Sequence, residues 1–570
     1  MTYAPPIRDM QFTLDKVIGA DRLAQTDLFA DATPDTVEAI LLEAGKLSAE
    51  VLAPVNRDGD LTPARLENGV VRASPGFAEA YKAIAEGGWV GMNADPEHGG
   101  MGLPMILTTA VGEMMNSACL SLALNPLMTQ GQIEALEHHA SDEIKELYLP
   151  KLTSGEWTGT MNLTEPQAGS DVGALRSKAE PQGDGTYKVT GQKVYITWGD
   201  HDVAENICHL VLARLPDGVP GTKGISLFLV PKFLPDQNGN PGVANTLKPI
   251  SLEHKLGLHG SPTAVMEFEG ATGWMVGPEH GGMAAMFTMM NNARLGVGVQ
   301  GLGIAEAAYQ KALAYAQDRV QGATMVSDTN TILDHADVRR MLMQMKALTG
   351  SARAICLDTA FSLDMARASS GDEAAKWKAR GAFLTPIAKA FGTDVGSEVA
   401  DLGIQVHGGM GYIEETGAAQ YARDVRVTRI YEGTNGIQAM DLVGRKLMDG
   451  GTAGEALLGE IEATAKAARA DHPDLADALQ DAGETLASTM DWLLKAEMND
   501  RFAGSVPFLR AFALVLGGHY LLRGAMAQDS RLPLAQYHIL QLMPQAAALC
   551  AAVVQGAAPL YALDAEALAS

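Results

Sequence analysis

A change of residue pattern in the middle of the chain most constrains its fold. Short β-branched runs at 186–198, 207–213, 225–230 and 264–268 are separated by Gly, Pro and Asp turns. Long stretches with the apolar spacing of helices lie on both sides, and no strand alternates with a long helix. This order excludes a doubly wound nucleotide-binding fold. It predicts a mainly helical α+β chain with an antiparallel β module in its middle.

The length of 570 residues exceeds what one ordinary core holds. We expect an N-terminal helical domain, a middle β domain, a C-terminal helical domain and a further helical extension rich in Ala and Leu. Their expected bounds are 1–157, 158–277, 278–450 and 451–570. In the third domain, five apolar residues recur at the spacing of one packed helix face: Val338, Met341, Leu342, Met345 and Leu348.

Charge and cysteine usage exclude several classes of function. The chain has 43 basic and 68 acidic side chains and a formal net charge of -25 at pH 7. It should repel phosphate backbones and anionic lipid, so we expect no nucleic-acid or membrane partner, although a few cations can hold a small anionic ligand. Four widely spaced cysteines indicate no metal site and no disulfide scaffold. The N-terminal residues do not have the pattern of a leader, and no apolar run of about 20 residues occurs in the sequence. We therefore expect a cytoplasmic protein.

One apparent nucleotide-binding motif has the wrong context. Residues 296–301 spell G-x-G-x-x-G, and Asp318 follows at the distance expected of a dinucleotide fingerprint. That fingerprint needs a strand before it, whereas the preceding residues have a helical pattern. Small residues that allow close helix packing are the better interpretation.

Four other segments carry residues suited to chemistry. Residues 164–171 form a proline-stiffened turn followed by small residues that let a ligand approach the backbone, and 193–199 form an aromatic strand end. A glycine-rich loop covers 405–412, and a Gly-broken turn at 430–436 carries Glu432. Taken singly, three of them have an ordinary explanation: 164–171 as a surface turn, 193–199 as a core strand and Glu432 as a solvated turn acid. A ligand could thread between the glycine-rich loop and the Glu432 turn.

Together, in this order and spacing, the segments resemble the acyl-CoA dehydrogenase family over roughly residues 10 to 445. The hallmarks are T-E-P-x-A-G-S-D, the I-T-x-G strand, a helical Arg319, the G-G-x-G-Y loop and Y-E-G-T. The resemblance implies an N-terminal helical domain, a middle antiparallel β domain and a C-terminal four-helix bundle, here with an additional helical module. It also implies FAD as cofactor.

The resemblance assigns roles residue by residue. Glu432 is the expected catalytic base, Arg319 is expected to bind the FAD of a partner subunit, and Asn291 replaces a common acidic residue. Further departures from the family pattern are Tyr195 in place of Trp, the run Val320-Gln321-Gly322, and Gly436. The expected FAD contacts are Leu163, Thr164, Gly169, Ser170, Tyr195, Thr197, Arg319, Gln405, Gly409, Gly433 and Thr434. The expected substrate contacts are Arg294, Asn291 and Ser170.

The implied reaction is FAD-dependent α,β-dehydrogenation of a short acyl-CoA to a trans-2-enoyl-CoA, with electrons passed to an electron-transfer flavoprotein. The long N-terminus and helical tail resemble the branch that converts 3-(methylthio)propanoyl-CoA to 3-(methylthio)acryloyl-CoA in dimethylsulfoniopropionate degradation. A butyryl-type dehydrogenase and an acyl-CoA oxidase stay as alternatives. A DNA-associated flavoprotein of the same family is disfavoured because the tail is acidic. In relatives with such a tail, the added helices cover the surface that shorter members of the family use to form tetramers. The resemblance therefore predicts a homodimer.

Overall fold

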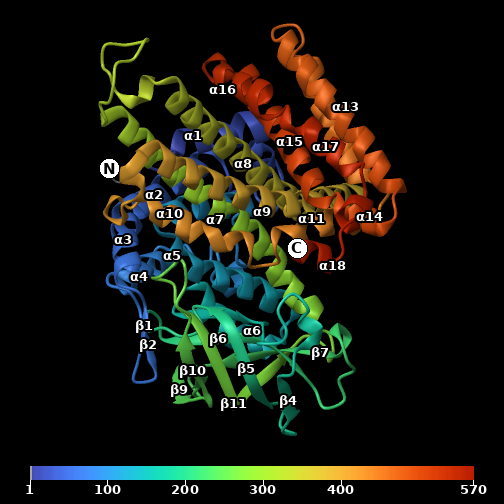
Figure 1. Cartoon of the computed structure of the whole chain (residues 1–570). Helices are drawn as coiled ribbons and strands as arrows, with labels where there is room; N and C mark the ends of the chain where they lie inside the picture. The colour runs from blue at the N-terminus through green and yellow to red at the C-terminus, as the bar shows by residue number, and fades with distance from the viewer. Residues whose placement is uncertain (1–2) are drawn as a thin grey trace.

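The computed structural model describes residues 3–570, except for the side chain of Asn291. Its strands gather at one end of the molecule and its long helices at the other (Figure 1). The chain is mainly helical, with one β domain between helical stretches, as its sequence predicts. This confirms the expected fold class.

The N-terminal region is helical except for one hairpin. Its elements are α1 Ile7–Phe12, α2 Pro34–Lys46, α3 Ala53–Leu61, β1 Arg65–Glu67, β2 Val70–Arg72, α4 Phe77–Glu86, α5 Met105–His139 and α6 Asp142–Thr153. The backbone of α5 leaves helical geometry at Cys119. The sequence analysis did not predict β1 and β2, because three-residue strands are too short to show a period of two. Their Asn68-Gly69 turn, with both φ angles positive, is nevertheless a typical hairpin signal.

The middle domain contains all four predicted strands and several shorter ones. Its strands are β3 Trp157–Asn162, β4 Lys178–Pro181, β5 Tyr187–Thr197, β6 Asn206–Arg214, β7 Ile225–Pro231, β8 Phe233–Pro235, β9 Pro241–Ala244, β10 Leu247–Leu252 and β11 Thr263–Val276. The pairings β11–β5–β4–β6–β7–β11 close a ring, and apolar side chains such as Val211, Phe228, Met266 and Phe268 form a core of their own.

The sequence analysis predicts an antiparallel middle domain, and two of its strand pairings are parallel instead. Strand β3 pairs with β6 in parallel, in the register Trp157↔Asn206 to Asn162↔Val211. Strand β4 also meets β6 in parallel, at Lys178↔Arg214. Parallel pairing needs a long crossover, and the chain between β3 and β6 supplies one that includes β4 and β5. The sheet is therefore mixed.

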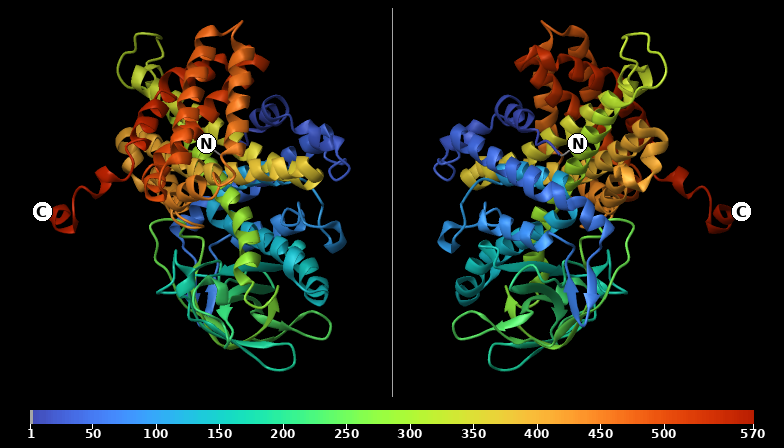
Figure 2. Two further views of the ribbon diagram at one scale, coloured as in Figure 1. Left: turned by 90° about the vertical axis from the view of Figure 1, so that its right-hand side faces the viewer. Right: turned by 90° about the vertical axis from the view of Figure 1, so that its left-hand side faces the viewer.

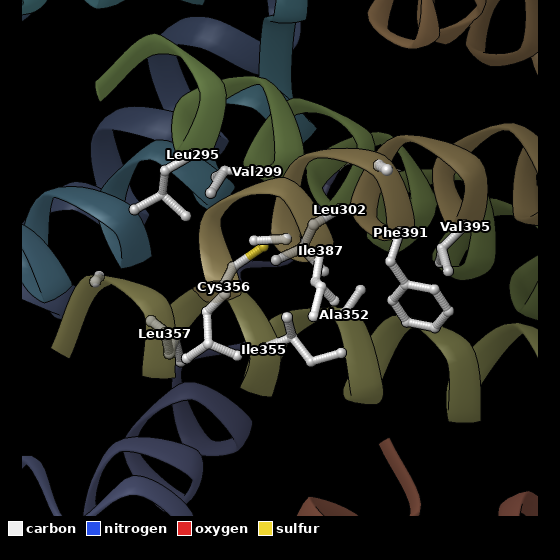
Figure 3. Close-up of a cluster of buried hydrophobic side chains, with 14 of the residues drawn as sticks. Leu295, Val299, Leu302, Ala352, Ile355, Cys356, Leu357, Ile387, Phe391 and Val395 are labelled. Carbon is white, nitrogen blue, oxygen red and sulfur yellow. The ribbon is translucent and has the colours of Figure 1, made fainter. Parts of the chain in front are cut away.

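The C-terminal domain is a bundle of long helices. Its helices are α7 Gly282–Asp318, α8 Ala336–Ala368, α9 Gly371–His407, α10 Ala418–Val425 and α11 Asn435–Gly444. Figure 3 shows apolar side chains of α7, α8 and α9 meeting between the three helices. Four of the five residues predicted for the buried face of α8 are at most 4% exposed: Met341, Leu342, Met345 and Leu348.

The glycines of the G-x-G-x-x-G run lie inside α7, where Gly298 and Gly301 pack against α9 and Gly296 packs against Leu127 of α5. A Cβ on Gly298 would lie 2.5 Å from the carbonyl oxygen of Ala388, so no larger residue fits there. Farther along, Gly403 lies against Ala308, so α7 and α9 run in the same direction. The interpretation of this run as a helix-packing motif is confirmed.

The extension adds α12 Thr452–Ala468, α13 Pro473–Lys495, α14 Met498–Ala503, α15 Ser505–Ala527, α16 Leu532–Tyr537, α17 Gln545–Val553 and α18 Ala565–Ala569. Helix α15 packs on α8, and a Cβ on Gly517 would lie 2.7 Å from the Ser351 hydroxyl oxygen. Within the described chain, α15 is the one helix long and apolar enough to cross a membrane, but 78% of its most apolar window is buried in the fold. Two views in Figure 2 show the last residues extending away from the body.

A buried ionic cluster joins three helices of the body. Arg353 on α8 donates to Glu113 on α5, with its Nε 3.0 Å from each carboxylate oxygen, and to Glu306 on α7 at 2.7 Å. All three side chains are at most 9% exposed. Because one guanidinium donates to both acids, the cluster aligns these helices and gives each buried carboxylate a hydrogen-bond partner.

Candidate active site

The turn that carries Glu432 has an unusual backbone. It lies between a 3-10 turn at Arg426–Arg429 and the start of α11. Glu432 has φ +56° and Gly433 has φ +81°, so two successive residues are left-handed. The Thr434 hydroxyl then accepts from the Ile437 N–H at 3.2 Å and caps α11. A non-glycine residue in this conformation is strained, which marks the turn as a candidate functional site.

The carboxylate of Glu432 is incompletely paired. Its Oε2 is buried and accepts no hydrogen bond in the described part of the chain. Burial raises its pKa to about 7, and the positive charges of Arg294 and Lys389 oppose that rise. A carboxyl group with a pKa near neutrality and a free oxygen is suited to accept a proton from a ligand.

The two cations whose charges act on Glu432 belong to different helices. Arg294 on α7 is 6% exposed, and its nearest carboxylate is Asp441 on α11, with 3.6 Å between Nη1 and Oδ2. Among the residues that the structure describes, the Arg294 Nε is buried without a partner, and burial lowers the pKa of this guanidinium. Lys389 on α9 is fully buried, and its Nζ donates to the Asn435 side-chain oxygen at 2.9 Å. Burial lowers the pKa of Lys389 to about 8.

Two amide side chains hold the turn in place. Gln438 donates to the carbonyl oxygens of Glu432 and Gly433, at 3.1 and 3.3 Å. Asn435 donates to the Ala390 carbonyl oxygen on α9 at 3.2 Å and to Asp394 at 3.0 Å. The left-handed turn is thus bonded to its own helix on one side and to α9 on the other.

A second cluster forms around the T-E-P turn. Lys193 on β5 is fully buried and donates to Glu165 at 2.8 Å and to the Leu163 carbonyl oxygen at 3.0 Å. Glu165 also accepts from the N–H and hydroxyl groups of Ser177. Burial alone would raise the pKa of Glu165. The charge of Lys193 and these hydrogen bonds outweigh burial and lower the pKa to about 2. The ion pair therefore fixes the turn to β5.

A β-bulge directs Tyr195 outward beside this turn. Two residues of β5, Val194 and Tyr195, oppose the single residue Val265 of β11. Tyr195 has φ +61° and its side chain is 64% exposed. The Val194 N–H donates to the Thr164 carbonyl oxygen at 2.9 Å. The structure thus brings the predicted residues Leu163, Thr164, Tyr195 and Thr197 together, while Gly169 and Ser170 lie exposed on the same loop.

A third group lies at the far end of the bundle. Tyr315 of α7 stacks on His407 of α9, with 4.4 Å between ring centroids, so the two helices end together. Arg319, Gln405 and Gly409 are exposed at this end. The distance along α9 from Ala390 to Gln405 is about 22 Å at 1.5 Å per residue, which separates them from Glu432. Arg319 itself is extended just after α7, so the expectation that it is helical is wrong.

The predicted residues therefore form three groups: Glu432, Gly433, Thr434 and Arg294; the residues of the T-E-P turn and β5; and the exposed end of α7 and α9. The predicted contact of the Asn291 side chain lies outside the described part of the chain. The sequence analysis missed Lys389, Asn435, Gln438 and Lys193. A fully buried lysine gives no local signal, and only its isolated position in an apolar helix pattern could have drawn attention to Lys389.

Comparisons with known proteins agree with this arrangement. The acyl-CoA dehydrogenase N-terminal, middle and C-terminal domain models match residues 37–156, 160–271 and 280–448, and an acetyl-CoA dehydrogenase C-terminal-like model matches 457–564. A 3-methylmercaptopropionyl-CoA dehydrogenase of Ruegeria pomeroyi is 45% identical over 93% of this chain and 92% of its own length. A butyryl-CoA dehydrogenase of Syntrophomonas wolfei is 37% identical over 78% of this chain and 75% of its own.

Solved structures give the same result for the fold. The crystal structure of Caenorhabditis elegans ACDH-11 in complex with C11-CoA superposes with a TM-score of 0.80 at 21% identity, over 94% of this chain and 91% of that one. The domain order, the left-handed glutamate turn and these similarities lead to one conclusion: this chain belongs to the acyl-CoA dehydrogenase family.

Proposed function

We propose that this FAD-dependent acyl-CoA dehydrogenase uses Glu432 to take a proton from the carbon next to the thioester carbonyl of a short acyl-CoA. The observation that supports this most is the buried Oε2 of Glu432, which has no partner among the described residues and lies within the influence of two buried cations, Arg294 and Lys389. Its pKa of about 7 matches a general base that works near neutral pH. The Glu432 N–H also makes no hydrogen bond within the described chain, so it is free to donate to the thioester oxygen.

The chain has suitable surfaces for FAD. Gly169 and Gly409 have open space where a Cβ would stand, so phosphate or ribose groups can approach the backbone there. The exposed ring of Tyr195 offers an aromatic surface beside Thr197, and Arg319 offers an exposed cation. We assign these residues, with Leu163, Thr164, Ser170, Gln405, Gly433 and Thr434, to FAD binding. When bound, FAD accepts the hydride that leaves the β-carbon of the substrate.

We further propose 3-(methylthio)propanoyl-CoA as substrate, within dimethylsulfoniopropionate degradation. The Ruegeria relative that supports this is similar over nearly the full length of both chains. A cavity of about 50 Å³ lies between α5 and α7, and its lining includes Met92, Met115, Leu295 and Val299. Arg294 directly precedes Leu295, so the cavity and the cation beside Glu432 share α7. Butyryl-CoA is the alternative, supported by the Syntrophomonas relative.

The remaining assignments concern assembly and electron transfer. We propose a cytoplasmic homodimer in which Arg319 binds the FAD of the partner subunit, because it lies far from its own Glu432 turn. The proposed electron acceptor is an electron-transfer flavoprotein. Sedimentation giving a stable tetramer would contradict the dimer, and rapid peroxide formation under air would favour an oxidase.

Turnover of a panel of acyl-CoA thioesters with an artificial electron acceptor tests the reaction and its substrate. We expect the highest kcat/KM with 3-(methylthio)propanoyl-CoA or butyryl-CoA and a steep decline for longer chains. The same panel run with Glu432→Gln should show bound FAD and almost no turnover. Near wild-type turnover by this variant would refute Glu432 as the base.

A further inference from the structure

Lys389 is an unusual buried charge close to the Glu432 turn. It lies on α9 among apolar residues and is fully buried. Within the described chain, its ammonium group makes one hydrogen bond, to the neutral side chain of Asn435, and no ion pair within 4.0 Å. A buried cation with a single neutral partner destabilises a fold. A methionine would fill the same space without that cost, so the charge itself needs a reason.

The surrounding acids already have cations of their own. Asp394, on the same helix as Lys389, pairs with Arg429 at 2.6 Å. Asp441 on α11 pairs with Arg445 at 2.6 Å and lies 3.6 Å from Arg294. Glu432 is the acid in this cluster without an ion pair or hydrogen bond at Oε2. The unneutralised positive charges that act on Glu432 are therefore those of Lys389 from α9 and, in part, Arg294 from α7.

The hydrogen bonds connect Lys389 to the geometry of the turn as well. The Lys389 ammonium group donates to the side-chain oxygen of Asn435. The side-chain nitrogen of Asn435 donates in turn to three residues of α9: Ala390, Thr393 and Asp394. Asn435 is the first residue of α11 and comes three residues after Glu432. Asn435 therefore links the left-handed turn to α9, together with the Arg429–Asp394 pair three residues before Glu432. Lys389 and Thr393 both donate to the Asn435 side-chain oxygen and so help to set the orientation of this amide.

We propose that Lys389 is a positioning residue for the base: through Asn435 it holds the turn against α9, and its charge favours the ionised carboxylate of Glu432. This inference rests on the proposed role of Glu432. The pKa of Glu432, which burial raises to about 7, is held down by Lys389 together with Arg294. Without Lys389, less of the carboxylate is ionised at neutral pH and the rate of proton removal falls.

The test compares Lys389→Met with Lys389→Arg, which keeps the charge, and with Lys378→Met, a matched control at an exposed position of the same helix. For each variant, kcat and KM are measured across pH, bound flavin by its visible absorbance, and stability by thermal melting. In Lys389→Met we expect the acidic limb of the kcat/KM profile to move about one pH unit toward alkaline pH, because loss of a nearby positive charge raises the pKa of a carboxylate by that order.

The same pH profile distinguishes the loss of the Lys389 charge, which acts only at low pH, from a loss of activity at every pH. Below neutral pH, kcat of Lys389→Met should fall about tenfold and recover as pH rises. Lys389→Arg should keep the wild-type limb, and Lys378→Met should match wild type throughout. If Lys389→Met fails to fold, Lys389→Gln takes its place, since its amide still donates to Asn435. An unmoved limb, or equal loss at every pH, would refute the positioning role. Full activity of Glu432→Gln would instead refute the proposed base.

Discussion

Two regions of this protein bury charged groups, and they differ in whether the buried carboxylates have hydrogen-bond partners. In the Arg353 cluster, both carboxylates bind one guanidinium, and every pair is within 3.0 Å. At the Glu432 turn, one carboxylate oxygen has no partner among the residues that the structure describes, and the cations that act on it bind other groups. Complete pairing stabilises a helix packing arrangement. Incomplete pairing leaves a reactive group free for a ligand, at the expense of stability.

The strongest test of this contrast is Glu432→Gln, which removes the base and keeps the shape of the side chain. We expect dehydrogenation to fall by about 10³-fold or more, since general-base catalysis contributes on that scale. Stopped-flow reduction of the bound flavin by substrate measures this step directly. Glu455→Gln, at an exposed position of α12, should leave the rate unchanged. An equal effect of both substitutions would remove the distinction between the two acids.

Arg353→Met should have the largest effect on stability. It leaves Glu113 and Glu306 buried without a cation, and breaking such a pair costs about 3–5 kcal/mol in the free energy of unfolding. Chemical denaturation followed by circular dichroism measures the loss.

Replacing the whole cluster provides the control for Arg353→Met. With both acids also changed to Leu, most of the lost stability should return, because no unpaired charge is left in the interior. If the triple variant is as unstable as Arg353→Met, the cluster acts through its shape and not through its charge pairing.

The pH dependence of stability should separate the two kinds of carboxylate. Folding raises the pKa of Glu432 from 4.5 to about 7, so its ionisation destabilises the fold progressively between these pH values. Glu432→Gln should therefore be more stable than wild type above neutral pH, by on the order of 1–3 kcal/mol, and equal to it below pH 4.5. Thermal melting without substrate, across pH, tests this sign.

Glu165 should behave in the opposite sense. Its pKa is lowered from 4.5 to about 2 in the fold, so its contribution to stability is complete above pH 4.5 and is lost as pH falls toward 2. The difference between wild type and Glu165→Gln should therefore disappear in acid. A pH-independent difference would show that Glu165 acts through packing alone.

The sequence was sufficient for the parts of the fold that depend on local pattern. Strands β5, β6, β7 and β11 and the buried face of α8 follow from residue spacing, and the Glu432 turn follows from its glycine and its motif. The parallel pairing of β3 with β6 depends on a crossover that no local signal reveals. Lys193 and Lys389 bind partners 28 and 46 residues away, and a lysine is ordinarily solvated, so their burial could not be predicted.

The smallest effect expected is that of a single buried hydroxyl group. The Tyr431 hydroxyl donates to Gln300 of α7, whereas the Tyr148 hydroxyl is buried without a partner in the described chain. Tyr431→Phe should cost about 1 kcal/mol, because it leaves the Gln300 oxygen unsatisfied, whereas Tyr148→Phe should be neutral or slightly stabilising. Opposite signs in thermal melting would show that pairing, not burial, decides the energy of a polar group here. If both variants lose stability equally, that rule fails, and the unpaired oxygen of Glu432 would no longer indicate a site kept open for chemistry.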